Sequence, residues 1–238
     1  MRTIIVTYLT IGEKMLTLSE MLQSSAWARA LSEEELKYVN TGIVVRTIPA
    51  GGFACMKGEP VDHWMGVVDG LVKMASNWSS GKTTSFTGLS AGGWFGEGSM
   101  LKTDARKYDV IALRESQVAY MNRSTFQWLL DHSIPFNRFL IIQLNERLGQ
   151  FIGMMEHERL LDTDARLARC LASMFNPVLY PGISREIKIS QEEIGFLAGV
   201  SRQRVNQALR KLEESGLLRI DYGSVTILDL DGLRCFGE

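Results

Sequence analysis

The sequence predicts an α+β protein in three parts: an N-terminal β-roll or jelly roll, a long helix, and a C-terminal winged helix-turn-helix. Short β-like runs separated by glycine-rich turns fill residues 42–124, and a helical pattern of unusual length occupies 135–159. The stretch 189–217 contains two short amphipathic helices joined by a tight turn. At 238 residues the chain is long enough for two domains with substantial cores. We place the parts at 16–132 (effector-sensing roll), 133–160 (dimerisation helix) and 161–238 (DNA-binding domain).

Two helices are expected before the roll, within residues 16–40. Leu18, Met21 and Leu22 are spaced as on one apolar helix face, and Ser32 followed by three glutamates is typical of a capped helix start. The preceding residues, MRTIIVTYLTIGEKM, lack a clear cleavage site and make a poor signal peptide. They are expected to be a disordered leader, or translation begins at Met15 or Met21.

The strongest hairpin signal in the roll lies at Asp69-Gly70, between the apolar runs 63–68 and 71–74. An Asp-Gly pair suits the two positive φ angles of a type I′ turn, so these runs are expected to pair directly. Several such strands before any long helix predict a closed roll or jelly roll.

The long helix has two apolar faces. One face repeats at spacings of three and four, as in a coiled-coil seam, and predicts a parallel homodimer through Ile141, Leu144, Leu148, Phe151 and Met155. Off this seam, and expected to pack on the roll, are Phe136, Phe139, Leu140 and Ile152. A helix buried wholly within one chain is the alternative. A further helix capped by Asp162 precedes a proline-containing loop that leads to the last module.

The helix-turn-helix is predicted from its caps. Ser190 with Glu193 forms a capping box, Gly199 ends the first helix where a left-handed residue is needed, and Ser201 caps the second helix. The residues expected to face inward are Ile194, Leu197, Ala198, Val205, Ala208, Leu209 and Leu212. A β-hairpin predicted over 217–228 completes a winged module.

The outward face of the second helix carries arginine, glutamine and lysine with no acid in its first three turns. Arginine and glutamine make bidentate contacts to guanine and adenine edges, and other cations contact phosphates. The predicted DNA-contact set is Ser201, Arg202, Gln203, Arg204, Asn206 and Gln207. The net charge of the whole chain is only −1. Basic charge is nevertheless concentrated on this helix face, as in a selective binder. The alternative is a ligand-sensing interaction module that does not bind DNA.

Composition excludes several other classes. No run of about 18 apolar residues is present, so no membrane span is expected. Three widely separated cysteines fit a reducing cytoplasm and exclude a four-cysteine iron–sulfur cluster within one chain. The three histidines, His63, His132 and His157, are isolated, so neither a metal site nor haem is expected.

An enzyme is also not expected. Ser80-Gly81-Lys82-Thr83 resembles the end of a phosphate-binding loop, but Ser76 stands where that motif requires glycine. Strand-like residues flank it on both sides, which favours a polar hairpin turn. No nucleophile with a neighbouring base is apparent either.

Taken in order, the roll with Gly96-Glu97, the long helix and the winged module resemble the Crp/Fnr family of bacterial transcription regulators. The resemblance covers nearly the whole chain from about residue 16 and is most specific at EEIGFLAGVSRQRVNQALRKLEESGLL. It implies a cytoplasmic homodimer that binds a palindromic operator in double-stranded DNA, and that contacts RNA polymerase if it is an activator. It also implies base reading by Arg202, Gln203 and Gln207. Family members often carry glutamate and arginine at the two glutamine positions, so the preferred half-site is expected to differ.

The resemblance also defines an effector site. Cyclic-nucleotide-binding members hold the ribose with a Gly-Glu pair and the cyclic phosphate with an arginine followed by serine or threonine. This pattern implies an effector-binding set of Gly96, Glu97, Arg106 and Lys107, with lysine where the hydroxyl residue belongs. Phe151 and Ile152 stand where polar groups would meet adenine, and an unpaired buried amino group costs about 1–3 kcal/mol. The effector is therefore left open: a cyclic nucleotide, another small anion, or none.

Overall fold

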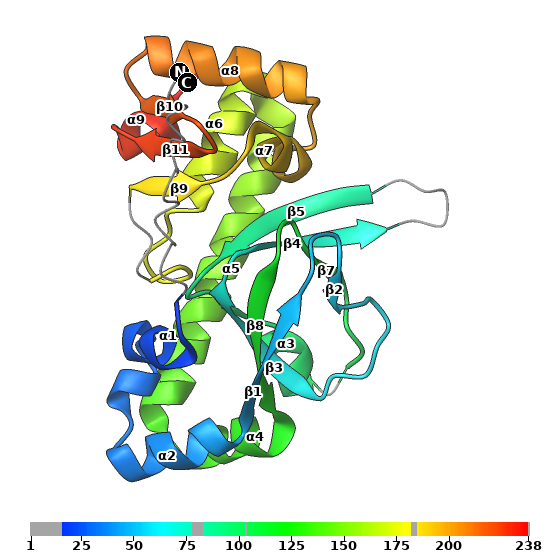
Figure 1. The fold of residues 1–238 in the computed structure, drawn as a ribbon, viewed down its shortest axis with the longest axis vertical. Helices are drawn as coiled ribbons and strands as arrows, with labels where there is room; N and C mark the ends of the chain where they lie inside the picture. The colour runs from blue at the N-terminus through cyan, green and yellow to red at the C-terminus, as the bar shows by residue number, and fades with distance from the viewer. Residues whose placement is uncertain (1–15, 78–82, 103, 182–184, 238) are drawn as a thin grey trace, which may run out of the picture.

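The computed structural model describes residues 16–77, 83–102, 104–181 and 185–237. Its three parts follow the predicted order, with a β-roll, a long helix beside it and a C-terminal module (Figure 1). The roll is built from two four-stranded antiparallel sheets. The first sheet has the order β1 (Ile43–Ile48), β8 (Ser116–Asn122), β3 (His63–Asp69) and β6 (Trp94–Phe95). The second has the order β2 (Phe53–Cys55), β7 (Asp109–Ala112), β4 (Leu71–Asn77) and β5 (Thr83–Ser90).

The hairpin predicted at Asp69-Gly70 is wrong. Strand β3 pairs with β6 and β8, whereas β4 pairs with β5 and β7, so this turn carries the chain from one sheet to the other. Gly70 has a φ of 97°, and a Cβ there would lie 2.3 Å from the Oγ of Ser116. The glycine therefore serves a close backbone approach between sheets rather than a two-residue hairpin.

Short helices cover the end of the roll that is remote from the C-terminal module (Figure 1). They are α1 (Leu18–Ser24), the 3₁₀ turn η1 (Ala28–Ala30), α2 (Glu33–Thr41) and α4 (Arg123–His132), while α3 (Glu97–Lys102) follows β6. The predicted cap at Ser32 is confirmed: its Oγ accepts from the backbone of Glu35, whose side chain accepts in return from Ser32. Beneath these helices lies an aromatic cluster, formed by Trp27, Trp64, Trp94, Phe126 and Phe136.

The long helix α5 spans Ile134–Leu160, with Ser133 as its N-cap. As predicted, Phe136 and Leu140 are buried against the roll. Ile152, also expected to pack there, is 57% exposed, so this expectation is wrong. It lies instead on an outer stripe of exposed apolar side chains, formed by Ile134, Ile141, Leu144, Leu148, Ile152 and Met155. Phe151 is half-buried.

The C-terminal module contains the predicted winged helix-turn-helix. Its helices are α6 (Thr163–Ser173), α7 (Gln191–Ala198), α8 (Arg202–Glu214) and α9 (Leu230–Cys235). The wing is β10 (Leu218–Asp221) with β11 (Ser224–Ile227), and β9 (Glu186–Lys188) adds a third strand that was not predicted. Among the described residues, no helix combines the length and apolar character needed to cross a membrane. Most of the loop-like motif at 80–83 lies outside the described residues, and Thr83 begins β5.

Candidate DNA-reading helix and effector site

The helix-turn-helix forms through the caps that the sequence predicted. The Oγ of Ser190 accepts from the backbone N–H of Glu193 at 3.2 Å, and the Glu193 carboxylate accepts from the Ser190 N–H at 2.7 Å. Gly199 ends α7 with φ 67° and ψ 31°, in the left-handed region that favours glycine. Ser201 then caps α8 by accepting from the backbone of Arg204. These short-range interactions fix where α7 begins and ends and where α8 begins.

Helix α8 presents a polar face to solvent at the end of the molecule remote from the roll (Figure 1). Its opposite face is buried through Val205, Ala208, Leu209 and Leu212, as predicted. Of the predicted DNA-contact set, Ser201, Arg202, Gln203 and Gln207 are exposed. This face therefore offers a guanidinium and two amides that are free to approach a groove.

The other two predicted contact residues are turned toward the protein. Arg204 is half-buried, with its Nη2 2.7 Å from the carboxylate of Asp164 on α6, and Lys211 lies 2.5 Å from the same carboxylate. Asn206 donates to the side chain of Gln191 at 3.2 Å. Both residues hold α8 against neighbouring helices in this arrangement, and their DNA contacts remain a prediction.

The candidate effector site lies where β6 leads into α3. Glu97 and Arg106 are 3% and 5% exposed. Arg106 donates through Nη2 to the carbonyl of His63, while its Nη1 and the Oε2 of Glu97 have no hydrogen-bond partner among the described residues. Gly96 has a φ of 90°, and a Cβ there would lie 2.6 Å from Arg106 Nη1. The glycine thus leaves room for the guanidinium next to Glu97.

Helix α5 adds two buried polar side chains that the sequence reading missed. Arg147 donates to the carbonyl of Trp94 at 3.0 Å, and its Nε lies 3.9 Å from the carboxylate of Glu97. Gln143 donates to the same carbonyl at 3.1 Å. A sequence signal existed, since residues 143 and 147 continue at helical spacing the buried stripe that begins with Phe136 and Leu140.

Lys107 is not in the site. It is exposed and pairs at the surface with Asp104 at 3.3 Å. Its neighbour Tyr108 is partly buried, and burial, reinforced by the negative charge of Glu97, raises the pKa of its phenol well above the ordinary value. The phenol therefore stays protonated and is able to donate a hydrogen bond. The charges of Glu97 and Arg106 both act on this phenol, which makes Tyr108 a candidate hydroxyl for the site.

Of the expected apolar wall, Ile152 lies on the outer stripe, and Phe151 is half-buried. Helix α5 instead turns the polar side chains of Gln143, Arg147 and Gln150 toward the roll. Gln150 donates to Thr87 at 3.1 Å, and its Oε1 is buried without a hydrogen-bond partner among the described residues. With one carboxylate and two guanidiniums, the buried charges at Glu97, Arg106 and Arg147 fit a small anion that also carries hydroxyl groups.

Two family models match the two ends of this arrangement. Residues 45–133 match the cyclic nucleotide-binding domain, and residues 165–236 match the Crp-like helix-turn-helix domain. The cAMP-activated global transcriptional regulator CRP of Haemophilus influenzae is 23% identical over 220 residues, covering 91% of this chain and 98% of that protein. The CRP-like cAMP-activated global transcriptional regulator of Mycobacterium tuberculosis (strain ATCC 25618 / H37Rv) is 26% identical over 189 residues, covering 78% and 84%.

Solved structures share the fold. FixK2 from Bradyrhizobium japonicum has a TM-score of 0.68 at 18% identity, covering 82% of this chain and 98% of that chain. A CooA mutant from Carboxydothermus hydrogenoformans has a TM-score of 0.66 at 18% identity, covering 90% and 96%. The fold and sites define a DNA-binding transcription regulator with a sensory domain of the cyclic nucleotide-binding type. The chain belongs to the Crp/Fnr family, whose members are transcription regulators rather than enzymes.

Proposed function

We propose that the protein is a homodimer that reads a palindromic operator with its two α8 helices while the roll binds a small anionic effector. The observation that carries the DNA-reading role is the exposed face of Arg202, Gln203 and Gln207, presented by a capped helix-turn-helix. The roll, dimer helix and DNA-binding domain follow the limits 16–132, 133–160 and 161–238. The protein acts in the cytoplasm, where it meets DNA, contacts RNA polymerase if it activates, and has no catalytic role.

Dimerisation is proposed through the outer stripe of α5. Ile141, Leu148 and Met155 recur every seven residues, and each is more than half exposed in the single chain. A continuous apolar row of this kind is typical of an interface, and a parallel coiled coil places it on one seam. The interface comprises Ile141, Leu144, Leu148, Phe151 and Met155, to which we add Ile152. Two-fold symmetry then gives two α8 helices for two half-sites, about 34 Å apart.

Replacing Arg202 with alanine is expected to lower operator affinity by about 1–3 kcal/mol and to relax base preference at one position of each half-site. The reason is the loss of an exposed bidentate donor. An operator is first selected from random DNA with the wild-type protein, and fluorescence anisotropy then measures binding at several salt concentrations.

Arg210→Ala is the matched control on the same helix. Arg210 is exposed two turns further on, so its loss is expected to weaken all sequences alike and to lower the salt slope by about 1. Unchanged operator binding by Arg202→Ala would remove the base-reading assignment. Failure of the wild type to enrich any sequence would favour the alternative, an interaction module that does not bind DNA.

For the effector, we favour the cyclic nucleotide class. Such a ligand supplies a phosphate monoanion and a ribose hydroxyl, for which the donors of Arg106 and Arg147 and the acceptor of Glu97 are suited. The unpartnered atoms of these three buried side chains support this assignment. Tyr108 contributes a protonated phenol, and Gln150 a free acceptor for an exocyclic amino group.

Calorimetric titration of the dimer with cyclic AMP and cyclic GMP tests this assignment. Glu97→Gln and Arg106→Gln are each expected to weaken binding by about tenfold or more, because each removes a charge-assisted hydrogen bond. Lys107→Gln is the control and is expected to bind normally, since Lys107 is exposed. No heat with either nucleotide, from a protein that still selects palindromic DNA, would exclude the cyclic nucleotide and leave another small anion or no ligand.

A further inference from the structure

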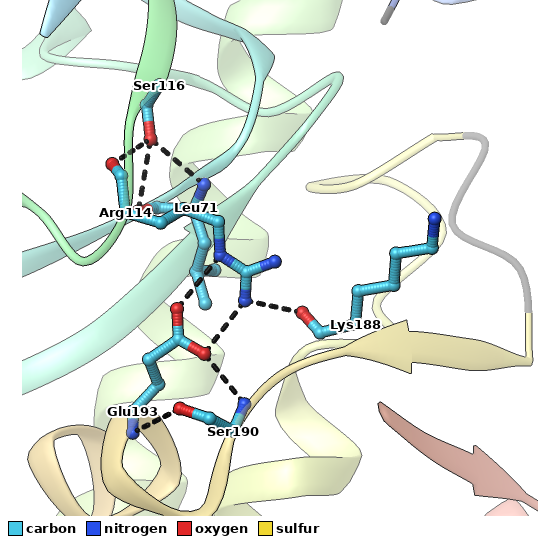
Figure 2. A network of polar contacts seen from close by, with 6 residues as sticks. All are labelled: Leu71, Arg114, Ser116, Lys188, Ser190 and Glu193. Atoms are coloured by element: carbon cyan, nitrogen blue, oxygen red, sulfur yellow. Dashed lines mark hydrogen bonds and ion pairs between the residues drawn. The ribbon is translucent and has the colours of Figure 1, made fainter. Parts of the chain in front are cut away.

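An ion pair joins the roll to the DNA-binding module. Arg114, in the loop between β7 and β8, places its Nε 2.9 Å from Oε1 of Glu193 and its Nη2 2.9 Å from Oε2. The same Nη2 donates to the carbonyl of Lys188 at 2.6 Å. Figure 2 shows this guanidinium reaching from the roll to the start of α7. The contact is bidentate, so it constrains direction as well as distance.

Both ends of the pair are anchored. On the roll side, Ser116 is buried; its Oγ donates to the carbonyl of Arg114 at 2.9 Å and accepts from the N–H of Leu71 at 3.1 Å (Figure 2). On the module side, the Glu193 carboxylate also accepts from the N–H of Ser190 in the capping box. The guanidinium is therefore tied through the Glu193 carboxylate to the first turn of α7, which packs directly against α8.

Apolar contacts also join the roll to the DNA-binding module near this ion pair. Leu71 of β4 belongs to the core cluster of the DNA-binding module, and a Cβ at Gly88 of β5 would lie 3.1 Å from Leu197 of α7. Apolar contacts hold two surfaces together but define their relative angle weakly, whereas a bidentate ion pair defines that angle closely. The side chain of Glu193 is only 12% exposed and that of Arg114 is 34% exposed, so water screens the pair from the arginine side only.

We propose that Arg114 and Glu193 are a positioning pair that sets the angle of α8 relative to the roll, and thereby the half-site spacing that the dimer accepts. This inference rests on the proposed function. One additional base pair between half-sites displaces the second half-site by about 3.4 Å and rotates it by about 34°. A firmly held α8 discriminates against that change. An α8 freed by loss of the pair follows the displaced half-site more readily.

The test compares operators whose half-sites are separated by the selected spacing and by one base pair more or fewer. Arg114→Gln removes the guanidinium. Glu193→Gln removes the charge but keeps the capping box, in which glutamine replaces glutamate. Each single variant is expected to lower the ratio of affinities between the best and the altered spacings by about fivefold, and the double variant by no more than either single. Arg114→Lys keeps a charge without the fork and is expected to give an intermediate ratio.

Two controls remove equivalent charges outside the pair. Lys57→Gln removes an exposed cation from the roll, and Glu192→Gln removes an exposed carboxylate next to Glu193. Both are expected to keep the wild-type ratio. Reduced affinity with an unchanged ratio would mean that the pair only stabilises the fold, and would overturn the proposal. The proposal would also be overturned if the reductions in this affinity ratio multiplied in the double variant, or if the controls reduced the ratio equally.

A second measurement separates this proposal from DNA reading itself. Spin labels at the exposed positions Thr47 and Arg210, in one protomer of a Cys235→Ser dimer, report the distance between the roll and α8 without DNA. That distance distribution is expected to broaden in Arg114→Gln and Glu193→Gln but not in the controls. An unchanged distribution would overturn the positioning role even if the operator work succeeds. If the distance distribution broadens in these variants but the wild type selects no DNA, the positioning role of the pair stands and the proposed function is rejected.

Discussion

Trp64→Ala is expected to destabilise the protein by about 3–5 kcal/mol, the range for removing a large aromatic side chain from a packed core. Trp64 is fully buried and lies between other rings: its ring centroid is 4.2 Å from that of Trp94 and 5.5 Å from that of Phe136. Trp64 belongs to β3 and these neighbours belong to β6 and α5, so the cavity would form where the long helix meets the roll. Urea unfolding followed by circular dichroism, at one fixed protein concentration, measures the change.

Trp128→Ala is the control for removing an indole ring. Trp128 of α4 is half-buried: its ring contacts those of Tyr38 and His132, and it packs against the core cluster without being enclosed by it. Its loss is expected to cost no more than about 1 kcal/mol, because little apolar surface is newly exposed. An equal decrease in the free energy of unfolding in the two variants would contradict the view that the aromatic cluster holds α5 against the roll.

This cluster also connects the effector site to the helix. The carbonyl of Trp94 accepts from both Gln143 and Arg147, and Arg147 in turn lies beside Glu97. A ligand that takes over the hydrogen bonds of Arg147 would therefore act directly on α5, which carries the proposed dimer seam. The candidate site and the proposed seam occupy different faces of the same helix.

The winged helix-turn-helix could be predicted in detail because its determinants are local. The capping box at Ser190 and the left-handed Gly199 act within a few residues, and the structure reproduces both. The Asp69-Gly70 hairpin was predicted by the same reasoning and is wrong. Strands β3 and β4 are buried on both faces, so their pattern carries no information on which strands they pair with. That choice depends on the distant strands β8 and β7.

The effector site was only partly predictable. Gly96, Glu97 and Arg106 follow one another closely in sequence and meet in space. Lys107 was expected beside Arg106 but is exposed, because residues 106–108 precede β7 as an irregular segment whose side-chain directions the sequence pattern does not define. Arg147 comes from a helix 50 residues away from Glu97, and only the docking of α5 on the roll brings it to the site.

The rotation of α5 about its own axis could not be predicted from the sequence. An apolar residue at 152 fits a face toward the roll or a face toward a partner equally well, and only packing decides. The structure places Ile152 with Leu148 on the exposed stripe. The burial of Phe136 and Leu140 on the other face fixes this rotation of the helix.

Leu148→Glu is therefore expected to convert the dimer to monomers and to abolish binding to the full palindrome at concentrations that saturate the wild type. Leu148 is 58% exposed at the middle of the stripe, so a glutamate is tolerated by the single chain. In a parallel dimer the two glutamates would meet at the seam, where like charges repel and burial penalises each of them. Light scattering gives the mass, and anisotropy with the full operator and with a single half-site gives the DNA affinity.

The size of the DNA effect follows from avidity. A dimer engages its second half-site at an effective concentration in the millimolar range, so losing it weakens operator binding by about 10²–10⁴-fold while half-site binding is retained. Phe53→Glu introduces the same charge at an exposed apolar position of β2, away from the stripe, and is expected to remain dimeric. A Leu148→Glu protein of unaltered mass would show that the chains associate elsewhere. Monomers that still bound the palindrome tightly would instead disconnect DNA reading from the α5 seam.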